Sequence, residues 1–190
     1  EKKANSLIND WKIDTSKFII LLPGRLSNWK GQEMFIESLN ILIEDYTKNN
    51  FEAIILGSDQ GRNVYSKKLY SLVERYQLNN KVKFIKFCKE MPLAYSIVDL
   101  VISSSIEPEA FGRVSVEAQA MKKPIIASNI GGSKETIVDG KSGILFKAGD
   151  PRELAKAINL NMEKDKEALY LIGNEGRKNV TKKFDVDKMC

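Results

Sequence analysis

The sequence contains no histidine, so it lacks the side chain most often used as a general base and as a metal ligand. Nucleophiles of the Ser-His or Cys-His type are excluded with it. Only two cysteines occur, Cys88 and Cys190, far apart and without the spacing of a metal site. We therefore expect free thiols in a reducing cytoplasm. Any chemistry must rest on carboxylates, lysine, arginine and backbone amides.

Long apolar runs are missing as well. No segment approaches the ~18 consecutive apolar residues that a membrane helix needs, and the first residues lead into no apolar stretch of a signal peptide. Because the chain does not begin with Met, we expect it to be part of a longer protein. The cytoplasm is the expected location, and peripheral association of the full-length protein with the inner face of the membrane is left open.

Charge of one sign is not concentrated anywhere. The formal net charge is +5, but the 30 basic residues are spread along the chain and mixed with 25 acidic ones. A nucleic-acid-binding protein more often gathers its basic residues on one stripe with aromatic residues between them. A phosphorylated small molecule or an anionic membrane face is therefore a better candidate partner than nucleic acid.

Short apolar runs rich in Ile and Val alternate with segments of helical periodicity, over a length of 190 residues that fits one domain. The expected strands are 18–22, 53–57, 82–85, 100–103, 124–127 and 143–146. The expected helices are 32–46, 64–78, 91–98, 112–121, 132–138 and 150–180. This alternation predicts an α/β fold with a doubly wound parallel sheet, Rossmann-like and covered on both faces. Ligands of such sheets bind beyond the carboxyl ends of the strands.

The loop after the first strand carries two cations, Arg25 and Lys30, beside Gly24 and Gly31 and just before a helix. Backbone amides at a helix N-terminus, together with Arg and Lys, can bind a diphosphate. The alternative is a solvated loop whose glycines only turn the chain, and the loop alone does not separate the two. Its spacing matches neither the dinucleotide fingerprint nor the P-loop, which weakens a dehydrogenase or ATPase interpretation.

Two glutamates lie in the loop after the fourth strand and in the helix that follows it. Glu109 lies in the loop and Glu117 follows eight residues later, about a turn and a half into the helix. One carboxylate can accept hydrogen bonds from sugar hydroxyls and the other from a ribose diol, and Gly112 would let a ligand approach the backbone. The alternative makes Glu109 a cap and Glu117 a first-turn acid paired with Arg113. For an isolated pair of glutamates, this structural alternative is the stronger one.

The order of the motifs resembles that of the family-four retaining glycosyltransferases. The motifs are Gly24-Arg25-Leu26 with Lys30-Gly31, Glu109 and Glu117 as E-x(7)-E, and Ile130-Gly131-Gly132 followed by Glu135. These enzymes have the GT-B fold, in which two Rossmann-like domains face each other across a cleft. The resemblance runs from about Phe18 to Leu160 and implies the C-terminal, donor-binding domain without the N-terminal acceptor domain. We expect one nucleotide-sugar-binding domain, with a lead-in at 1–17, a core at 18–160 and C-terminal helices at 161–190.

The resemblance also implies a role for individual residues. Arg25 and Lys30 match residues that hold the donor diphosphate, Glu109 one that contacts the transferred sugar, and Glu117 one that takes the ribose hydroxyls. The expected catalytic residues are Glu109, Arg25 and Lys30. The donor-binding set adds Gly24, Gly57, Lys86, Phe87, Ala110, Phe111, Gly112, Arg113, Val114 and Glu117. Within this set, Gly57 and the Lys86-Phe87 pair are weaker candidates, for contact with the base.

The activity implied is transfer of a sugar from a nucleoside-diphosphate donor to an acceptor, a cell-envelope glycan or lipid, with retention at the anomeric carbon. The resemblance implies no cofactor, no metal and no protein nucleophile, and we expect this chain alone to be inactive in transfer. The alternatives are a nucleotide-sugar epimerase of the same fold and a non-catalytic module that binds a nucleotide-sugar. The sequence does not identify the base, the sugar or the acceptor.

Three further features have simpler explanations. Asp185-Val186-Asp187 spells the D-x-D of metal-dependent glycosyltransferases, but it follows a helix at the chain end, which favours Asp185 as an N-cap. The segment 139–143 resembles a phosphate loop, but it joins a helix to a strand and predicts a turn. Lys123 stands where the family often has Gly. We expect little effect, because this position precedes a strand and does not line the cleft.

Overall fold

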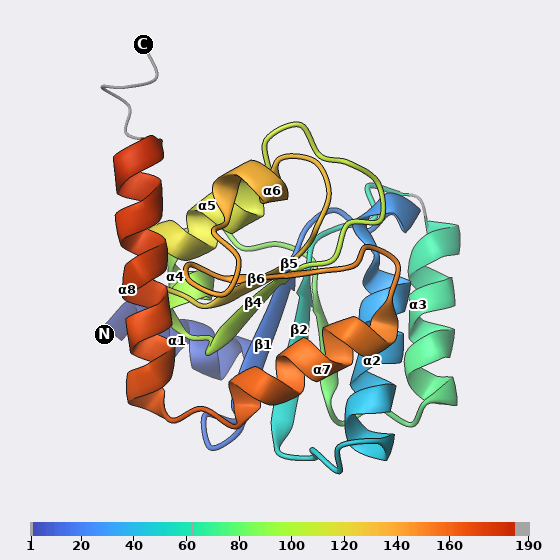
Figure 1. Cartoon of the computed structure of the whole chain (residues 1–190). Coiled ribbons are helices and arrows are strands. Elements are labelled where there is room, and N and C mark those ends of the chain that lie inside the picture. Colours follow the sequence, from blue (N-terminus) through green and yellow to red (C-terminus); the bar gives the residue numbers. More distant parts are fainter. Residues whose placement is uncertain (1, 62, 185–190) are drawn as a thin grey trace.

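The computed structural model describes residues 2–61 and 63–184. Six strands form one parallel sheet in the order β3-β2-β1-β4-β5-β6 (Figure 1). They are β1 (Phe18–Pro23), β2 (Phe51–Leu56), β3 (Val82–Ile85), β4 (Leu100–Ser103), β5 (Ile125–Ser128) and β6 (Ile144–Phe146). The order of connection reverses between β1 and β4, and a crevice forms at such a switch point in a doubly wound sheet. The predicted fold class is confirmed.

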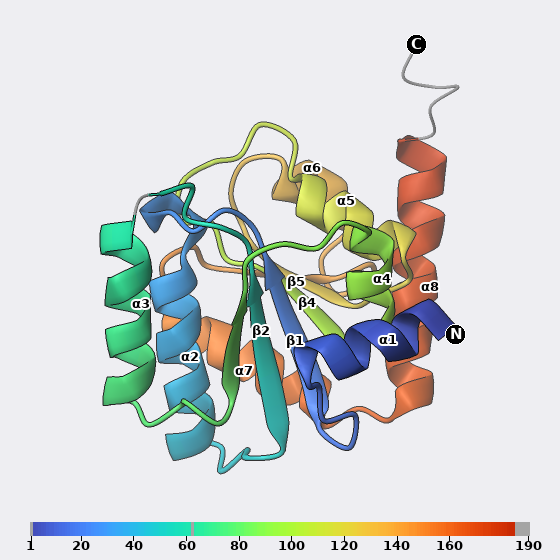
Figure 2. The same cartoon turned by 180° about the vertical axis from the view of Figure 1, so that it is seen from behind.

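Helices cover both faces of the sheet. They are α1 (Lys2–Trp11), α2 (Gln32–Glu44), α3 (Asn63–Arg75), α4 (Met91–Ser96), α5 (Arg113–Ala120), α6 (Ser133–Thr136), α7 (Pro151–Met162) and α8 (Lys166–Lys183). A short 3-10 helix, η1 (Asn28–Lys30), precedes α2. Helices α2, α3 and α7 cover one face, with α7 in front in Figure 1, whereas α1, α4 and α5 lie on the other side, in front in Figure 2. Helix α8 packs against α5 and, like α7, lies toward the viewer in Figure 1.

The central strand shows why both faces are covered. In β1, Ile20 and Leu22 belong to the apolar cluster under α2 and α7, while Ile19 and Leu21 belong to the cluster on the other face. All four side chains are buried. Because successive side chains of a strand point to opposite faces, an unbroken apolar run needs a layer on each side. The continuous apolar runs in the sequence therefore correctly predicted a sheet with helices on both faces.

The chain ends hold two features that the sequence pattern did not show. The segment expected as a lead-in contains α1, which contacts α4. The helical stretch expected from 150 to 180 is divided into α7 and α8, because Asp165 accepts a hydrogen bond from the Ala168 amide and starts a new helix. The predicted start at Asp150 is confirmed, since its side chain accepts from the amides of the first turn. The D-x-D at 185–187 lies outside the described residues.

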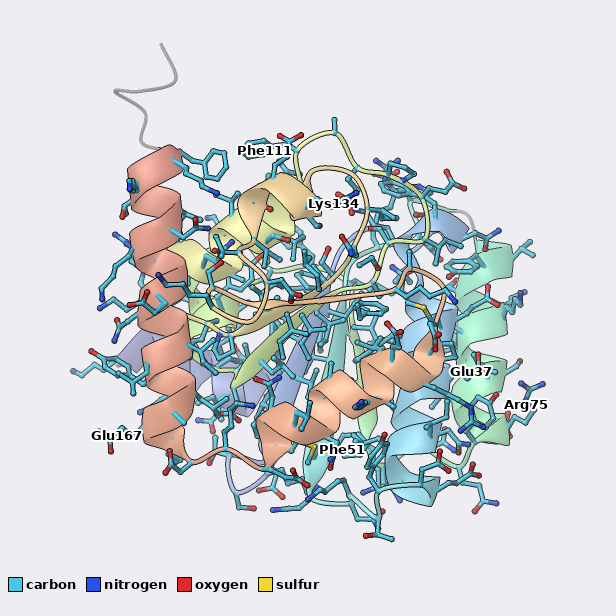
Figure 3. All side chains as sticks on the ribbon, in the orientation of Figure 1. Glu37, Phe51, Arg75, Phe111, Lys134 and Glu167 are labelled. Carbon is cyan, nitrogen blue, oxygen red and sulfur yellow. The ribbon has the colours of Figure 1, made fainter. Side chains whose placement is uncertain are left out.

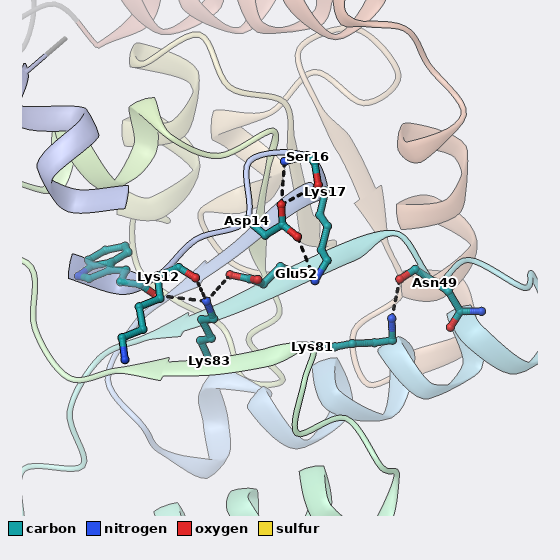
Figure 4. A network of polar contacts seen from close by, with 9 residues as sticks. Lys12, Asp14, Ser16, Lys17, Asn49, Glu52, Lys81 and Lys83 are labelled. Carbon is teal, nitrogen blue, oxygen red and sulfur yellow. Dashed lines mark hydrogen bonds and ion pairs between the residues drawn. The ribbon is translucent and has the colours of Figure 1, made fainter. Parts of the chain in front are cut away.

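An ion pair between a buried carboxylate and a half-buried lysine secures α1 to the sheet (Figure 4). The carboxylate of Glu52, in β2, is buried, and its Oε1 lies 2.8 Å from Nζ of Lys83 in β3. The same ammonium donates to the main-chain oxygens of Trp11, at 3.2 Å, and of Lys12. A buried carboxylate needs such a partner. The pair lies near the amino ends of the strands, at the edge of the sheet opposite the expected ligand site.

Candidate functional site

A cleft of about 610 Å³ opens at the carboxyl ends of the strands. Its walls are the loops that follow β1, β2, β3 and β4, together with parts of α4 and α5. This is the edge of the sheet at which ligands of doubly wound folds bind. Its lining residues are Pro23, Gly24, Arg25, Trp29, Lys30, Leu56, Gly57, Ser58, Lys86, Phe87, Cys88, Met91, Tyr95, Glu109, Arg113, Val114 and Glu117.

An ion pair joins the loop after β1 to the loop after β4 inside this cleft. Nζ of Lys30 lies 2.7 Å from Oε1 of Glu109, and the two side chains are only 14% and 18% exposed. The Lys30 ammonium also lies 4.3 Å from the ring centroid of Trp29, and the hydroxyl of Ser105 donates to Oε1 of Glu109. A predicted diphosphate-binding cation and a predicted sugar-binding carboxylate are therefore in direct contact.

Glycine permits the loops of the cleft to approach one another closely. Gly31 has φ +70°, and a Cβ there would lie 1.9 Å from the carbonyl oxygen of Ser104. A Cβ on Gly57 would lie 2.0 Å from the carbonyl oxygen of Gly24. The Ser104 hydroxyl adds a hydrogen bond of 3.0 Å to the Lys30 carbonyl. These glycines serve backbone packing between the loops after β1, β2 and β4, which explains the two positions without a ligand.

Glu117 projects from α5 into the cleft and is held from two sides. The hydroxyl of Tyr95, in α4, donates to Oε2 of Glu117 at 2.7 Å, and Nε of Arg113 lies 3.7 Å from Oε1. Burial, and then the neighbouring Glu117 carboxylate, raise the pKa of Tyr95, so its phenol stays protonated and donates at neutral pH. The Arg113 pair was foreseen as a helix-surface contact, whereas the contact with Tyr95 was missed.

The structure brings most of the predicted residues together. Those that line the cleft are Gly24, Arg25, Lys30, Gly57, Lys86, Phe87, Glu109, Arg113, Val114 and Glu117. Ala110, Phe111 and Gly112 are not among the lining residues. The sequence analysis missed the other lining residues, most of them because apolar, aromatic and sulfur-containing side chains look like core positions; they are Pro23, Trp29, Leu56, Ser58, Cys88, Met91 and Tyr95. Their place at the ends of β1 and β2, or in the segments that follow β1, β2 and β3, was the one signal available.

Phe111 and Gly112 have structural contacts of their own. Phe111 is exposed, and its ring meets that of Phe184, which follows α8, edge to face with centroids 5.5 Å apart. Figure 3 labels Phe111 beside the C-terminal end of α8. Gly112 has φ +71°, and a Cβ there would lie 3.1 Å from the Ser133 amide at the start of α6. The backbone of α6 therefore approaches Gly112 closely. A contact of either residue with a ligand stays a prediction.

The two glycines after β5 support the loop that carries Glu109. The Gly132 amide donates to the Glu109 carbonyl at 2.7 Å, and a Cβ on Gly131 would lie 2.4 Å from the same oxygen. A Cβ on Gly132 would meet the carbonyl carbon of Phe111 at 2.3 Å. The Ile130-Gly131-Gly132 motif thus acts on the site through the backbone of the loop that follows β4.

The remaining sequence features lie away from the cleft lining. Segment 139–143 is a turn, closed by a 2.9 Å hydrogen bond from the Gly140 amide to the Gly143 carbonyl, as predicted. Lys123 donates to the carbonyls of Ser96 and Val98, and its burial lowers the pKa of its ammonium. Within the described part of the chain, no group of three or more acidic or Cys side chains could hold a metal ion. No helix described in the structure has the length and apolar character needed to span a membrane.

A family model described as "Glycosyl transferases group 1" matches residues 4–179. The chain belongs to this family. The capsular polysaccharide biosynthesis glycosyltransferase CapM of Staphylococcus aureus is 29% identical over 184 residues, which are 97% of this chain and 45% of CapM. The structure of Anabaena HepE in complex with UDP and glucose superposes with a TM-score of 0.89 at 32% identity, over 99% of this chain and 50% of HepE.

A third comparison concerns the domain to which the chain corresponds. The C-terminal domain of the group 1 glycosyl transferase LpcC from Francisella tularensis matches with a TM-score of 0.80 at 27% identity, over 94% of this chain and 92% of that domain. The chain spans about half the length of CapM and of HepE. The predicted family and its GT-B relationship are confirmed, and the match to LpcC is consistent with a C-terminal domain.

Proposed function

We propose that this chain binds a nucleoside-diphosphate sugar in the cleft and is the donor domain of a retaining glycosyltransferase. The observation that carries the proposal is the meeting of Lys30 with Glu109, in one cleft with Arg25 and Glu117. The HepE complex, which contains UDP and glucose, supports it, because HepE shares this fold over 99% of the chain.

The cleft provides complementary chemistry for each part of such a donor. Arg25 and Lys30 are donors only, so they neutralise the diphosphate without a metal ion. Glu109, beside Lys30, accepts from hydroxyls of the sugar, and Glu117 accepts from those of the ribose. Lys86 and Phe87, in the loop after β3, provide contacts for the base.

For the transfer step, the negative charge that develops on the leaving diphosphate is stabilised by Arg25 and Lys30. The acceptor, a cell-envelope glycan or lipid, attacks from the face that the diphosphate leaves, and the configuration of the sugar is retained. The leaving group assists this attack, and no protein nucleophile takes part. The acceptor binds to a second domain of the full-length protein, which acts in the cytoplasm or at its membrane face.

Calorimetric titration of the chain with UDP, GDP and ADP, each with and without EDTA, tests the proposal. One of the diphosphates should bind, and chelation should change its affinity by less than about tenfold, or 1.4 kcal/mol. Absence of binding by all three would contradict the proposed donor site. A larger loss with EDTA would contradict its independence of metal ions.

The full-length protein tests the reaction itself. NMR of its product from an α-linked donor should show a new α-glycoside, whereas the chain alone should form none. A β-glycoside would contradict retention. A free epimer of the donor sugar, without a glycoside, would indicate the epimerase alternative, and binding without any product would indicate the non-catalytic module.

A further inference from the structure

Tyr95 occupies an unusual place for a buried aromatic residue. It is 1% exposed, packed in the apolar cluster that also contains Ala118 of α5, yet it reaches the lining of the cleft. A buried phenol needs a partner for its O–H group. Its partner here is the carboxylate of Glu117, 22 positions along the chain and at the cleft surface.

The hydrogen bond fixes one oxygen of that carboxylate. Oε2 of Glu117 accepts from Tyr95 at 2.7 Å, whereas Oε1 has Arg113 Nε at a longer 3.7 Å. A glutamate side chain has three rotatable bonds, and on a helix surface it is otherwise free to turn into solvent. The contact with the rigid, buried Tyr95 therefore selects one orientation of Glu117 and leaves Oε1 available to a ligand.

We propose that Tyr95 is a positioning residue that pre-orients Glu117 to accept from the ribose hydroxyls of the donor. This inference rests on the proposed function, since it assigns the ribose to Glu117. Tyr95 acts through Glu117 and contributes to ribose selectivity. Pre-organisation of this kind increases affinity because the ligand need not restrict the side chain on binding.

The Tyr95→Phe variant removes the hydroxyl and keeps the buried ring. Calorimetric affinities for the preferred ribonucleoside diphosphate and its 2′,3′-dideoxy analogue are compared in wild type, Tyr95→Phe, Glu117→Ala and the double variant. We expect Tyr95→Phe to weaken the ribonucleotide about tenfold and the dideoxy analogue by less than about twofold. In the Glu117→Ala background the same change should have little further effect, as a double-mutant cycle reports for groups that act together.

Tyr76→Phe is a matched control, because its hydroxyl interacts with Arg75 at the far end of α3. It should leave both affinities unchanged. Equal losses for the ribonucleotide and the dideoxy analogue in Tyr95→Phe would show that the ring only supports the fold, and would overturn the inference. Additive losses in the double variant would overturn it as well.

The two proposals fail in different ways. If wild type does not bind the ribonucleotide, or binds the dideoxy analogue equally well, the assignment of the ribose to Glu117 fails. If wild type and Glu117→Ala behave as expected but Tyr95→Phe still discriminates between the ligands fully, only the role of Tyr95 is overturned. Thermal unfolding of Tyr95→Phe shows whether the protein remains folded in each case.

Discussion

The two sides of the cleft are built differently. On the β1–β4 side, backbones touch at Gly31 and Ser104, the Ile106 amide donates to the Trp29 carbonyl at 2.8 Å, and Lys30 is paired with Glu109. On the β3 side, the loop that carries Phe87 has neither helix nor strand, and Phe87 is 74% exposed.

This difference fits the proposed donor site, in which one side binds the diphosphate and the sugar and the other side binds the base. The diphosphate and the sugar need charged groups at fixed positions, since electrostatic stabilisation depends on pre-organisation. A base needs an apolar surface, which an exposed loop can provide without close packing. Substitutions on the β1–β4 side should therefore lower both the stability of the protein and its affinity for the donor. Substitutions in the loop after β3 should lower the affinity alone.

The largest effect should come from Gly31→Ala. The added methyl group would meet the Ser104 carbonyl at 1.9 Å, and φ is +70°. We expect the free energy of unfolding to fall by about 3 kcal/mol or more, because a clash with backbone adds to left-handed strain of about 1–2 kcal/mol. Urea denaturation measures this loss.

Gly140→Ala is the matched control for that variant. Gly140 has φ +71° and nothing within 4 Å of an added Cβ, so only the strain of about 1–2 kcal/mol should appear. Equal losses of unfolding free energy in the two variants would show that the close contact between Gly31 and Ser104 does not restrict substitution on this side.

Lys30→Ala should weaken a bare nucleoside diphosphate by roughly ten- to a hundredfold. Hydrogen bonds to charged groups contribute about 1.5–3 kcal/mol, and this variant removes the cation proposed to contact the diphosphate. Calorimetry gives the affinity. Lys147→Ala, which removes an exposed lysine after β6, should bind as wild type does. An unchanged affinity in Lys30→Ala would exclude this lysine from the diphosphate site.

Glu109→Ala should separate the sugar from the diphosphate. If Glu109 accepts from the transferred sugar, the intact donor should bind about tenfold more weakly, while the bare diphosphate should change by less than about threefold. Glu107→Ala, in the same loop and exposed, is the control. A loss of the same size for both ligands would mean that Glu109 acts only by holding Lys30.

Phe87→Ala should have the smallest effect and should test the open side. We expect nucleotide affinity to fall by about three- to tenfold, while the free energy of unfolding changes by less than about 0.5 kcal/mol, as is usual for an exposed residue. Leu171→Ala, on the exposed face of α8, should change neither quantity. A clear loss of stability in Phe87→Ala would contradict the division between the two sides.

Local patterns were sufficient for the strands, for most helices and for the end of the sheet that bears the site, but they did not show α1 or the division between α7 and α8. Unbroken apolar runs predicted the buried strands, and β3 and β4 begin and end where expected. The cap at Asp150 was also predicted, because capping depends on neighbouring residues alone. The predicted residues in the loops after β1 and β4 meet for a topological reason: the carboxyl ends of parallel strands share one edge.

Contacts between distant segments were decided by the tertiary structure. The sequence did not indicate that Lys30 would pair with Glu109, that Tyr95 would hold Glu117, or that Gly112 would pack against α6. Nor did it show that α1 would be held by the half-buried Lys83 ammonium. Periodicity and capping report interactions within a few residues. The partner of a buried charge or hydroxyl is fixed only when strands and helices far apart in sequence pack side by side.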